Sequence, residues 1–172
     1  MIPSGYTRWR EKASQVFTSK RDQYGESWSE LSLPSFVDLL YVKAQRIRTL
    51  VQSGGKTATG ESTLADWLAL ANYAALALLR LRGVQSPVEE ALSSLYQEAE
   101  SLLTRKNADY GDAWSHMRPL AFVEFILMKL ARLRKMDTDP ARHAIAIEDN
   151  LFDIMNYALL YLVRYGDESL AP

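Results

Sequence analysis

The residues best suited to chemistry lie on the segment 144–164. Asp149, Asp153, Asn156 and Tyr157 are spaced at i, i+4, i+7 and i+8, which places them on one face of a helix. The remaining faces are apolar, so we expect this helix to be mostly buried. Carboxylates on it need a cation, a basic partner or a water-filled cleft. A binding or catalytic site is therefore predicted; the alternatives are a solvated face and an Asp153–Arg132 ion pair.

The segment 120–135 supplies complementary groups, because Glu124, Lys129 and Arg132 interrupt an otherwise apolar run. Glu124 joins Asp149 and Asp153 as a candidate ligand of Mg²⁺ or Mn²⁺, since oxygen ligands suit such hard cations. Lys129 and Arg132 would then face phosphate oxygens, Lys as a point charge and Arg through two hydrogen bonds. A structural ion-pair network between the two helices is the rival interpretation.

A third group of candidates lies on the segment 106–114. It combines a basic residue, an amide and two aromatic rings, a set that can hold a phosphate and stack on a base: Lys106, Asn107, Tyr110 and Trp114. Tyr24 and Trp28 stand in the same relation to each other earlier in the chain, so packing explains the rings equally well. Asp109 and His116 are weaker candidates.

An internal repeat positions these groups. Residues 18–48 align with 104–134, sharing Tyr-Gly, Trp, Phe-Val and Lys-x-x-Arg in one register, and Asn72-Tyr73 aligns with Asn156-Tyr157. The first copy has Ala65 and Ala69 at the places of Asp149 and Asp153. We therefore expect a degenerate site in the first copy and the candidate active site in the second. The shared asparagines are expected to be architectural, meeting across a pseudo-twofold axis.

Each copy reads as three helices, because the apolar spacing is helical and strand-like alternation is missing. The expected helices cover 7–21, 35–52, 63–82, 87–106, 120–135 and 144–164, with a turn-rich stretch at 107–112 and a helix end at 137–140. The predicted fold is all-α: a tandem duplication of a three-helix unit forming one pseudo-twofold helical bundle. The repeats span 1–83 and 84–172 and are expected to pack as one domain.

Composition narrows the partners. The 172-residue chain has a net charge of −1 and a sequence pI near 6.1, whereas a duplex nucleic-acid binder should carry a basic excess. It has no cysteine, which fits the reducing cytoplasm. Residues 1–10 lack the apolar run of a signal peptide. Asp66 and Asn72 interrupt the apolar segment 64–79, which favours a buried core helix over a membrane span.

Two strings then resemble a known family. Residues 105–114 read Arg-Lys-Asn-Ala-Asp-Tyr-Gly-Asp-Ala-Trp, and residues 148–157 read Glu-Asp-Asn-Leu-Phe-Asp-Ile-Met-Asn-Tyr. Together with Lys129-Leu-Ala-Arg132 they resemble the nucleotide-modification-associated domain family, especially bacterial members that carry the unit twice. That family is similar, more remotely, to MazG-like all-α nucleoside triphosphate pyrophosphatases, in which carboxylates on two neighbouring helices hold Mg²⁺.

The resemblance implies a Mg²⁺-dependent pyrophosphohydrolase that acts on nucleoside triphosphates, including modified ones. Glu124 and Asp153 would be catalytic, with Asp149 completing the metal site. The substrate-binding set would comprise Lys106, Asn107, Tyr110, Trp114, Lys129, Arg132 and Asn156. Leu127 and Asn150 stand where the MazG-like pattern has acidic residues, which favours the alternative of a non-catalytic nucleotide-binding accessory protein. A structural module that dimerises is the third hypothesis, and the sequence leaves a homodimer open.

Overall fold

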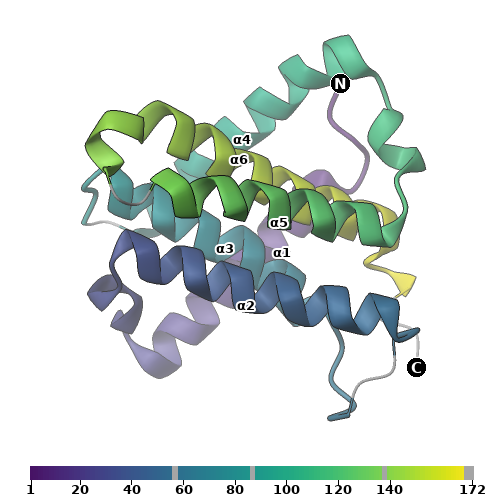
Figure 1. Cartoon of the computed structure of the whole chain (residues 1–172), viewed down its shortest axis with the longest axis horizontal. Coiled ribbons are helices and arrows are strands. Elements are labelled where there is room, and N and C mark those ends of the chain that lie inside the picture. Colours follow the sequence, from purple (N-terminus) through teal and green to yellow (C-terminus); the bar gives the residue numbers. More distant parts are fainter. Residues whose placement is uncertain (56–57, 86–87, 137–138, 169–172) are drawn as a thin grey trace.

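The computed structural model describes residues 1–55, 58–85, 88–136 and 139–168. Within these ranges every regular element is helical (Figure 1), which confirms the all-α prediction. Three α-helices and one short 3₁₀ helix occur in the first half, and the same order follows in the second. The elements are α1 (Tyr6–Tyr24), η1 (Ser27–Glu30), α2 (Leu33–Gln52), α3 (Leu64–Leu81), α4 (Val88–Tyr110), η2 (Ala113–His116), α5 (Pro119–Met136) and α6 (Pro140–Tyr165).

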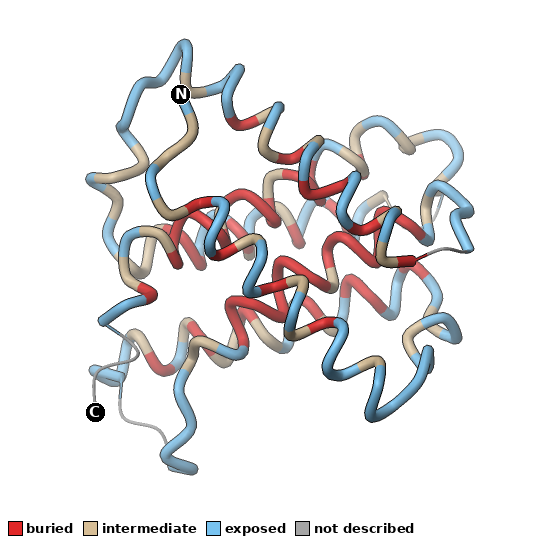
Figure 2. The backbone as a smooth tube through the Cα atoms, turned by 180° about the vertical axis from the view of Figure 1, so that it is seen from behind, coloured by how far each residue is buried: buried red, intermediate tan, exposed pale blue. Residues whose placement is uncertain are grey.

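The helices α3 and α6 form the centre of the molecule. They contact each other, while α2 packs on α3 and α5, and α5 packs on α6. The helices α1 and α4 lie across α3 and α6 and also touch each other. One hydrophobic cluster draws residues from all six helices, and Figure 2 shows the buried residues concentrated along the inner helices. Each half therefore buries its apolar surface against the other half as well as within itself.

The burial of α3 follows from its composition, because it is apolar on nearly every face. Only Asp66, Asn72 and Arg80 interrupt it strongly, and a helix that is apolar all round has to be surrounded by other elements. Its length and hydropathy would suit a membrane span, but 72% of that stretch is buried inside the protein. The interpretation of this segment as a core helix agrees with its packing between α1, α2 and α6.

Two buried asparagines connect the halves. Asn156 on α6 accepts a hydrogen bond from the Tyr6 hydroxyl at 2.7 Å, and its Nδ2 donates to the Ala99 carbonyl oxygen at 3.0 Å. Asn72 on α3 has the equivalent pair of bonds: it accepts from the Tyr96 hydroxyl at 2.6 Å and donates to the Ala13 carbonyl oxygen at 2.9 Å. The expected direct contact between the asparagines is replaced by these bonds, each joining an asparagine to one helix of either half.

Two helix boundaries differ by four residues from the sequence-based prediction, and α1 ends at Tyr24, three residues later than expected. The helix α4 continues through Asn107–Tyr110, which was expected to be a turn, so that stretch extends the helix by about one turn. The helix α6 begins at Pro140 instead of Ala144, because proline is favoured in the first turn of a helix and the Asp139 side chain accepts a hydrogen bond from the Arg142 amide at 3.2 Å. The expected helix start at Pro87 and the expected break at Asp137–Thr138 lie outside the described residues.

The repeated Tyr-Gly pair marks the end of a helix in both halves. Gly25 and Gly111 have positive φ angles of 68° and 62°, a backbone conformation that glycine adopts without steric cost. Their amides donate to the carbonyl oxygens of Arg21 and Asn107 at 2.8 and 2.9 Å. The chain then turns into η1 or η2, two 3₁₀ helices that the sequence pattern did not predict. These short helices carry Trp28 and Trp114.

Candidate functional site

A pocket in the second half collects most of the predicted substrate-binding residues. It encloses about 420 Å³ and lies among α4, η2, α5 and α6. We call it the second-repeat pocket; it is lined by Leu103, Lys106, Asn107, Tyr110, Ala113, Trp114, Met117, Lys129, Asp153, Asn156, Tyr157 and Leu160. Because α4 runs one turn further than expected, Lys106, Asn107 and Tyr110 project from a helix instead of a loop. The structure thus brings together three segments that lie far apart in the sequence.

The charged centre of this pocket is Asp153, which holds two lysines. Lys129 Nζ lies 2.7 Å from Asp153 Oδ2, and Lys106 Nζ contacts Oδ1. The side chains of Lys129 and Asp153 are only 14% and 16% exposed, whereas Lys106 is 51% exposed. A carboxylate with so little access to solvent needs cationic partners. The pairing of Asp153 with Arg132, which the sequence left as an alternative, is wrong.

Aromatic rings form the wall and rim of the pocket. Trp114 and Tyr157 are half-buried, and Tyr110 is 74% exposed at the rim. Tyr157 lies against Phe125 of α5, with 5.6 Å between ring centroids. Burial first, and then the charge of Asp153 and the neighbouring Tyr110, raise the pKa of Tyr157 above its usual range. Tyr157 therefore stays protonated at neutral pH and offers a neutral hydroxyl donor beside an aromatic face.

Two amide residues of the pocket differ in what they can still bind. Asn156 is buried, and its oxygen and nitrogen are both used in the bonds to Tyr6 and Ala99. It therefore contributes shape to the pocket wall. Asn107 is only partly buried, and its Nδ2 makes a long hydrogen bond of 3.4 Å to the Met1 carbonyl oxygen. No partner of Asn107 Oδ1 is found in the part of the chain that the structure describes, so this oxygen is available to a ligand.

Three predicted site residues lie outside the second-repeat pocket. Glu124, Asp149 and Arg132 are exposed, and none of them lines it. Among the residues that the structure describes, no group of three or more acidic or histidine side chains is arranged to hold a metal ion. Asp153, the one carboxylate among the described lining residues of the pocket, is already paired with two lysines. The residues present therefore do not fit a resident Mg²⁺ held by Glu124, Asp149 and Asp153.

The first half, where the sequence predicted a degenerate site, contains an equivalent pocket. We call it the first-repeat pocket; it encloses about 160 Å³ and is lined by Val16, Phe17, Lys20, Arg21, Tyr24, Gly25, Ser27, Trp28, Ala69, Asn72, Tyr73 and Leu76. The repeat alignment already contained the signal, because Lys20, Tyr24 and Trp28 align with Lys106, Tyr110 and Trp114. Ala69 takes the place of Asp153 in this smaller pocket.

The cations of α2 pair with a different carboxylate. Lys43 and Arg46, the counterparts of Lys129 and Arg132, pair with Asp66, which is 4% exposed. Lys43 Nζ lies 3.4 Å from Asp66 Oδ1, and Arg46 pairs with Oδ2. Asp66 takes the place of Asn150 in the alignment of the repeats. In the structure it anchors a buried ion-pair network between α2 and α3, outside the first-repeat pocket.

Comparison with known proteins agrees with this arrangement. The model of the family described as nucleotide modification associated domain 1 matches the chain twice, at residues 20–81 and 106–165. The protein belongs to this family, and the predicted family resemblance is confirmed. The matches begin at the two equivalent lysines, Lys20 and Lys106, so both pockets lie largely within the matched stretches. No curated protein and no solved structure matches the chain significantly.

Proposed function

We propose that the second-repeat pocket binds a nucleotide and that the protein acts as a nucleotide-binding component of nucleotide modification. The observation that carries this proposal is the convergence of Lys106 and Lys129 on Asp153 inside an aromatic-lined cavity of about 420 Å³. That volume falls within the range typical of small-molecule sites. The family description supports the same association with nucleotide modification.

The three charged groups differ in their degree of burial, and this suggests how a nucleotide would enter. Lys129 and Asp153 form the inner pair, and they stay compensated if their contact is kept. Lys106 is half-exposed and can exchange one carboxylate oxygen for a phosphate oxygen without leaving a buried charge alone. The phosphates would therefore lie at the rim on Lys106. The base would stack on Trp114 or Tyr157, and each such stacking contact contributes about 1–3 kcal/mol.

Pyrophosphate release in the manner of MazG-like enzymes is the second candidate. The family membership and the acidic residues of α5 and α6 favour it, but Glu124, Asp149 and Asp153 do not form a common metal-binding group. The arrangement of donors therefore supports binding without hydrolysis more strongly. A Mg²⁺ ion brought by the nucleotide itself remains compatible with the exposed position of Lys106.

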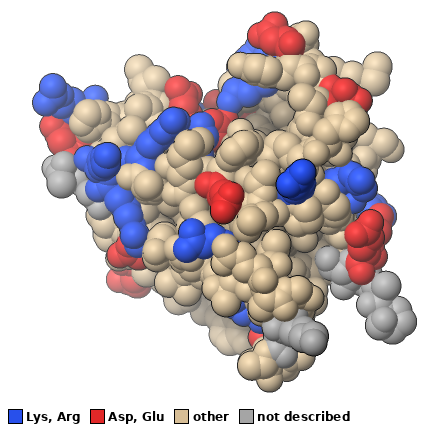
Figure 3. Space-filling model, turned by 45° about the vertical axis from the view of Figure 1, so that its right-hand side comes forward, with Lys and Arg blue, Asp and Glu red and all other residues tan. Residues whose placement is uncertain are grey.

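The partner we expect is a free nucleotide in the cytoplasm, and neither duplex nucleic acid nor a membrane belongs to the proposal. On the face shown in Figure 3, Lys and Arg side chains gather mainly on the left, with Asp and Glu side chains beside them. A duplex nucleic-acid binder should carry a basic excess, whereas the net charge of this chain is −1.

The proposal is tested by calorimetric titration with nucleoside mono-, di- and triphosphates, canonical and modified, in Mg²⁺, with products read by mass. Lys106→Met should weaken binding about tenfold, because it removes a charge-assisted hydrogen bond to phosphate. Arg132→Met is the matched control. It removes a cation of α5 that lies one turn after Lys129 and outside the pocket, so it should leave the affinity unchanged.

Equal losses in both variants, or no binding of any nucleotide, would contradict the proposal. Pyrophosphate release that disappears in Asp153→Asn would instead establish the hydrolase. Absence of any affinity would favour a structural module, and a sedimentation measurement would then show whether the chain forms a homodimer.

A further inference from the structure

We propose that the first-repeat pocket is a second ligand site, and that it takes a planar aromatic group carrying a negative charge, as a nucleoside monophosphate does. This site is separate from the second-repeat pocket and does not depend on the function proposed for it. The inference rests on two observations: a lysine without a carboxylate partner among the described residues, and an aromatic and apolar wall.

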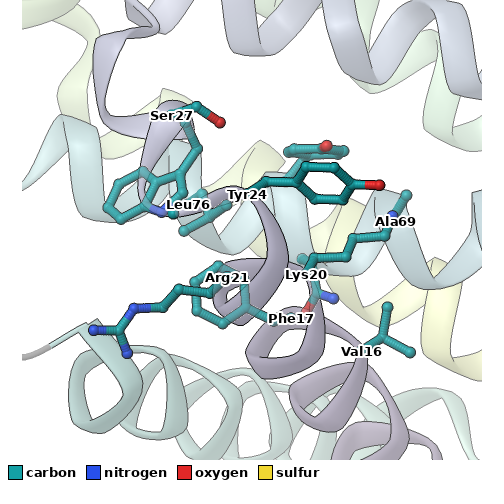
Figure 4. Close-up of a pocket in the computed structure, with 12 residues that line it drawn as sticks. Val16, Phe17, Lys20, Arg21, Tyr24, Ser27, Ala69 and Leu76 are labelled. Atoms are coloured by element: carbon teal, nitrogen blue, oxygen red, sulfur yellow. The ribbon is translucent and has the colours of Figure 1, made fainter.

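The unpaired cation is Lys20. In the part of the chain that the structure describes, no carboxylate lies within ion-pair distance of its ammonium group. Its counterpart Lys106 is held by Asp153, but Ala69 stands at that place in the first half. Figure 4 shows the Lys20 side chain running beside Tyr24 toward Ala69. Lys20 is exposed, so its ammonium group is solvated and available to an anionic group that enters the pocket.

The other cations near this pocket are already engaged. Arg21 pairs with Glu89, and its Nε lies 3.3 Å from Glu26; in Figure 4 it points away from Lys20 and Ala69. Lys43 is bound by Asp66 and does not line the pocket. Lys20 is thus the single available ammonium among the described lining residues, which suits one anionic group better than a triphosphate.

The walls of the pocket select a flat apolar group. Phe17, Leu76 and Ala69 are buried and line it, and Tyr24, Trp28 and Tyr73 add aromatic faces. Its volume of about 160 Å³ admits a ring system but leaves less room than the second-repeat pocket. The indole N–H of Trp28 is buried, and no acceptor for it is found among the described residues. The indole N–H groups of Trp9 and Trp67 are in the same situation, so Trp28 contributes the face of its ring to the pocket and not this donor.

The indole signals of the protein allow the two pockets to be read separately. The chain has four tryptophans; Trp28 lines the first-repeat pocket and Trp114 the second. In an NMR spectrum of ¹⁵N-labelled protein, each indole N–H gives one signal. The variants Trp28→Phe and Trp114→Phe show which signal belongs to which tryptophan. We expect adenosine monophosphate to shift the Trp28 signal in a saturable manner, while adenosine and inorganic phosphate, which each lack one half of the chemistry, shift it far less. Benzoate distinguishes an aromatic carboxylate from a nucleotide as the source of the charge.

Two substitutions test the role of the charge. Lys20→Met changes an exposed side chain and should weaken the response of Trp28 about tenfold. Ala69→Asp installs the counterpart of Asp153, so Lys20 gains an internal partner and the response should fall to a similar extent. Both variants should leave the response of Trp114 unchanged.

A Trp28 signal that does not move, or that responds equally in the wild type and in Lys20→Met, would overturn the inference. A silent Trp114 signal would count against the function proposed for the second-repeat pocket alone. If Ala69→Asp does not fold, the exposed Lys20→Met variant still decides between these outcomes.

Discussion

At the scale of single residues, Asp153 determines the difference between the two halves of the molecule. In the second half, Asp153 pairs with two lysines from different helices, so the pocket contains its own ion pairs. In the first half Ala69 stands at this place, and Lys20 has no carboxylate partner among the described residues. Lys43 pairs with Asp66, which stands where the second half has Asn150. These two differences between the repeats change the charge that each pocket presents to a ligand.

Replacing Asp153 by alanine should reveal how far this carboxylate also stabilises the fold. The substitution removes the carboxylate that pairs with Lys129, whose side chain is 14% exposed. Breaking such a buried pair costs about 3 kcal/mol. We expect the free energy of unfolding in urea to fall by about that amount. Combining Lys129→Met with Asp153→Leu should recover most of the loss, because no buried charge remains. A double variant as unstable as the single one would show that the carboxylate acts through other contacts.

At the scale of the helices, Arg82 connects three elements at the end of α3. Its Nη1 lies 2.9 Å from Glu98 of α4, and its Nη2 lies 2.7 Å from Glu148 of α6. The hydrogen bonds from Arg82 lower the pKa of Glu148 below its usual range. The end of α3 is thereby held against one face of the second half by charge as well as by packing.

This contact should give stability a dependence on pH. Because the pKa of Glu148 is lower in the folded than in the unfolded state, its contribution is present above the unfolded value of about 4.3. It is lost as the pH falls through the folded value. We expect Arg82→Met to flatten this part of the acid unfolding profile, by less than about 1 kcal/mol since the groups are a third exposed. Arg164→Met, at an exposed end of α6, is the control and should leave the profile unchanged.

At the scale of the whole molecule, the two halves are joined by the equivalent hydrogen bonds of Asn72 and Asn156. Each asparagine accepts from a tyrosine of the other half and donates to a carbonyl oxygen of its own. Burial raises the pKa of both tyrosines, Tyr6 and Tyr96, above the usual range, so the hydroxyls remain donors up to strongly alkaline pH. The bonds fix how α1 and α4 cross the central helices, and hence the shape of both pockets.

The equivalence of these bonds predicts equal costs. Asn72→Ala and Asn156→Ala each leave a buried tyrosine hydroxyl without its acceptor, at about 1–3 kcal/mol for an unsatisfied buried group. The carbonyl oxygens of Ala13 and Ala99 lie within α1 and α4 and keep their helical hydrogen bonds. We expect both variants to lose a similar free energy of unfolding. Chemical denaturation measures this directly. A loss in Asn156→Ala but none in Asn72→Ala would mean that only the second half uses the asparagine structurally.

The sequence by itself determined the all-α class and the repeated order of the helices. It predicted ten site residues, of which seven line the second-repeat pocket: Lys106, Asn107, Tyr110, Trp114, Lys129, Asp153 and Asn156. These follow from local spacing: apolar periodicity defines helices, and a register shared by two stretches places equivalent residues on equivalent faces. The all-α class is confirmed by the structure, while the binding roles of these residues remain predictions. The boundaries at Tyr110 and Pro140 were wrong because end signals compete over about one turn.

Only the tertiary structure decided which charges meet. Glu124, Arg132 and Asp149 share helices with the residues of the second-repeat pocket, yet they face outward. Asp153 pairs with Lys106 as well as with Lys129. Lys106 lies on α4, far from Asp153 in the sequence. Helical spacing fixes the face of a residue on its own helix, but the partner across the interface depends on how the helices cross. That crossing is set by packing in the shared core and by the bonds of Asn72 and Asn156, which no local pattern encodes.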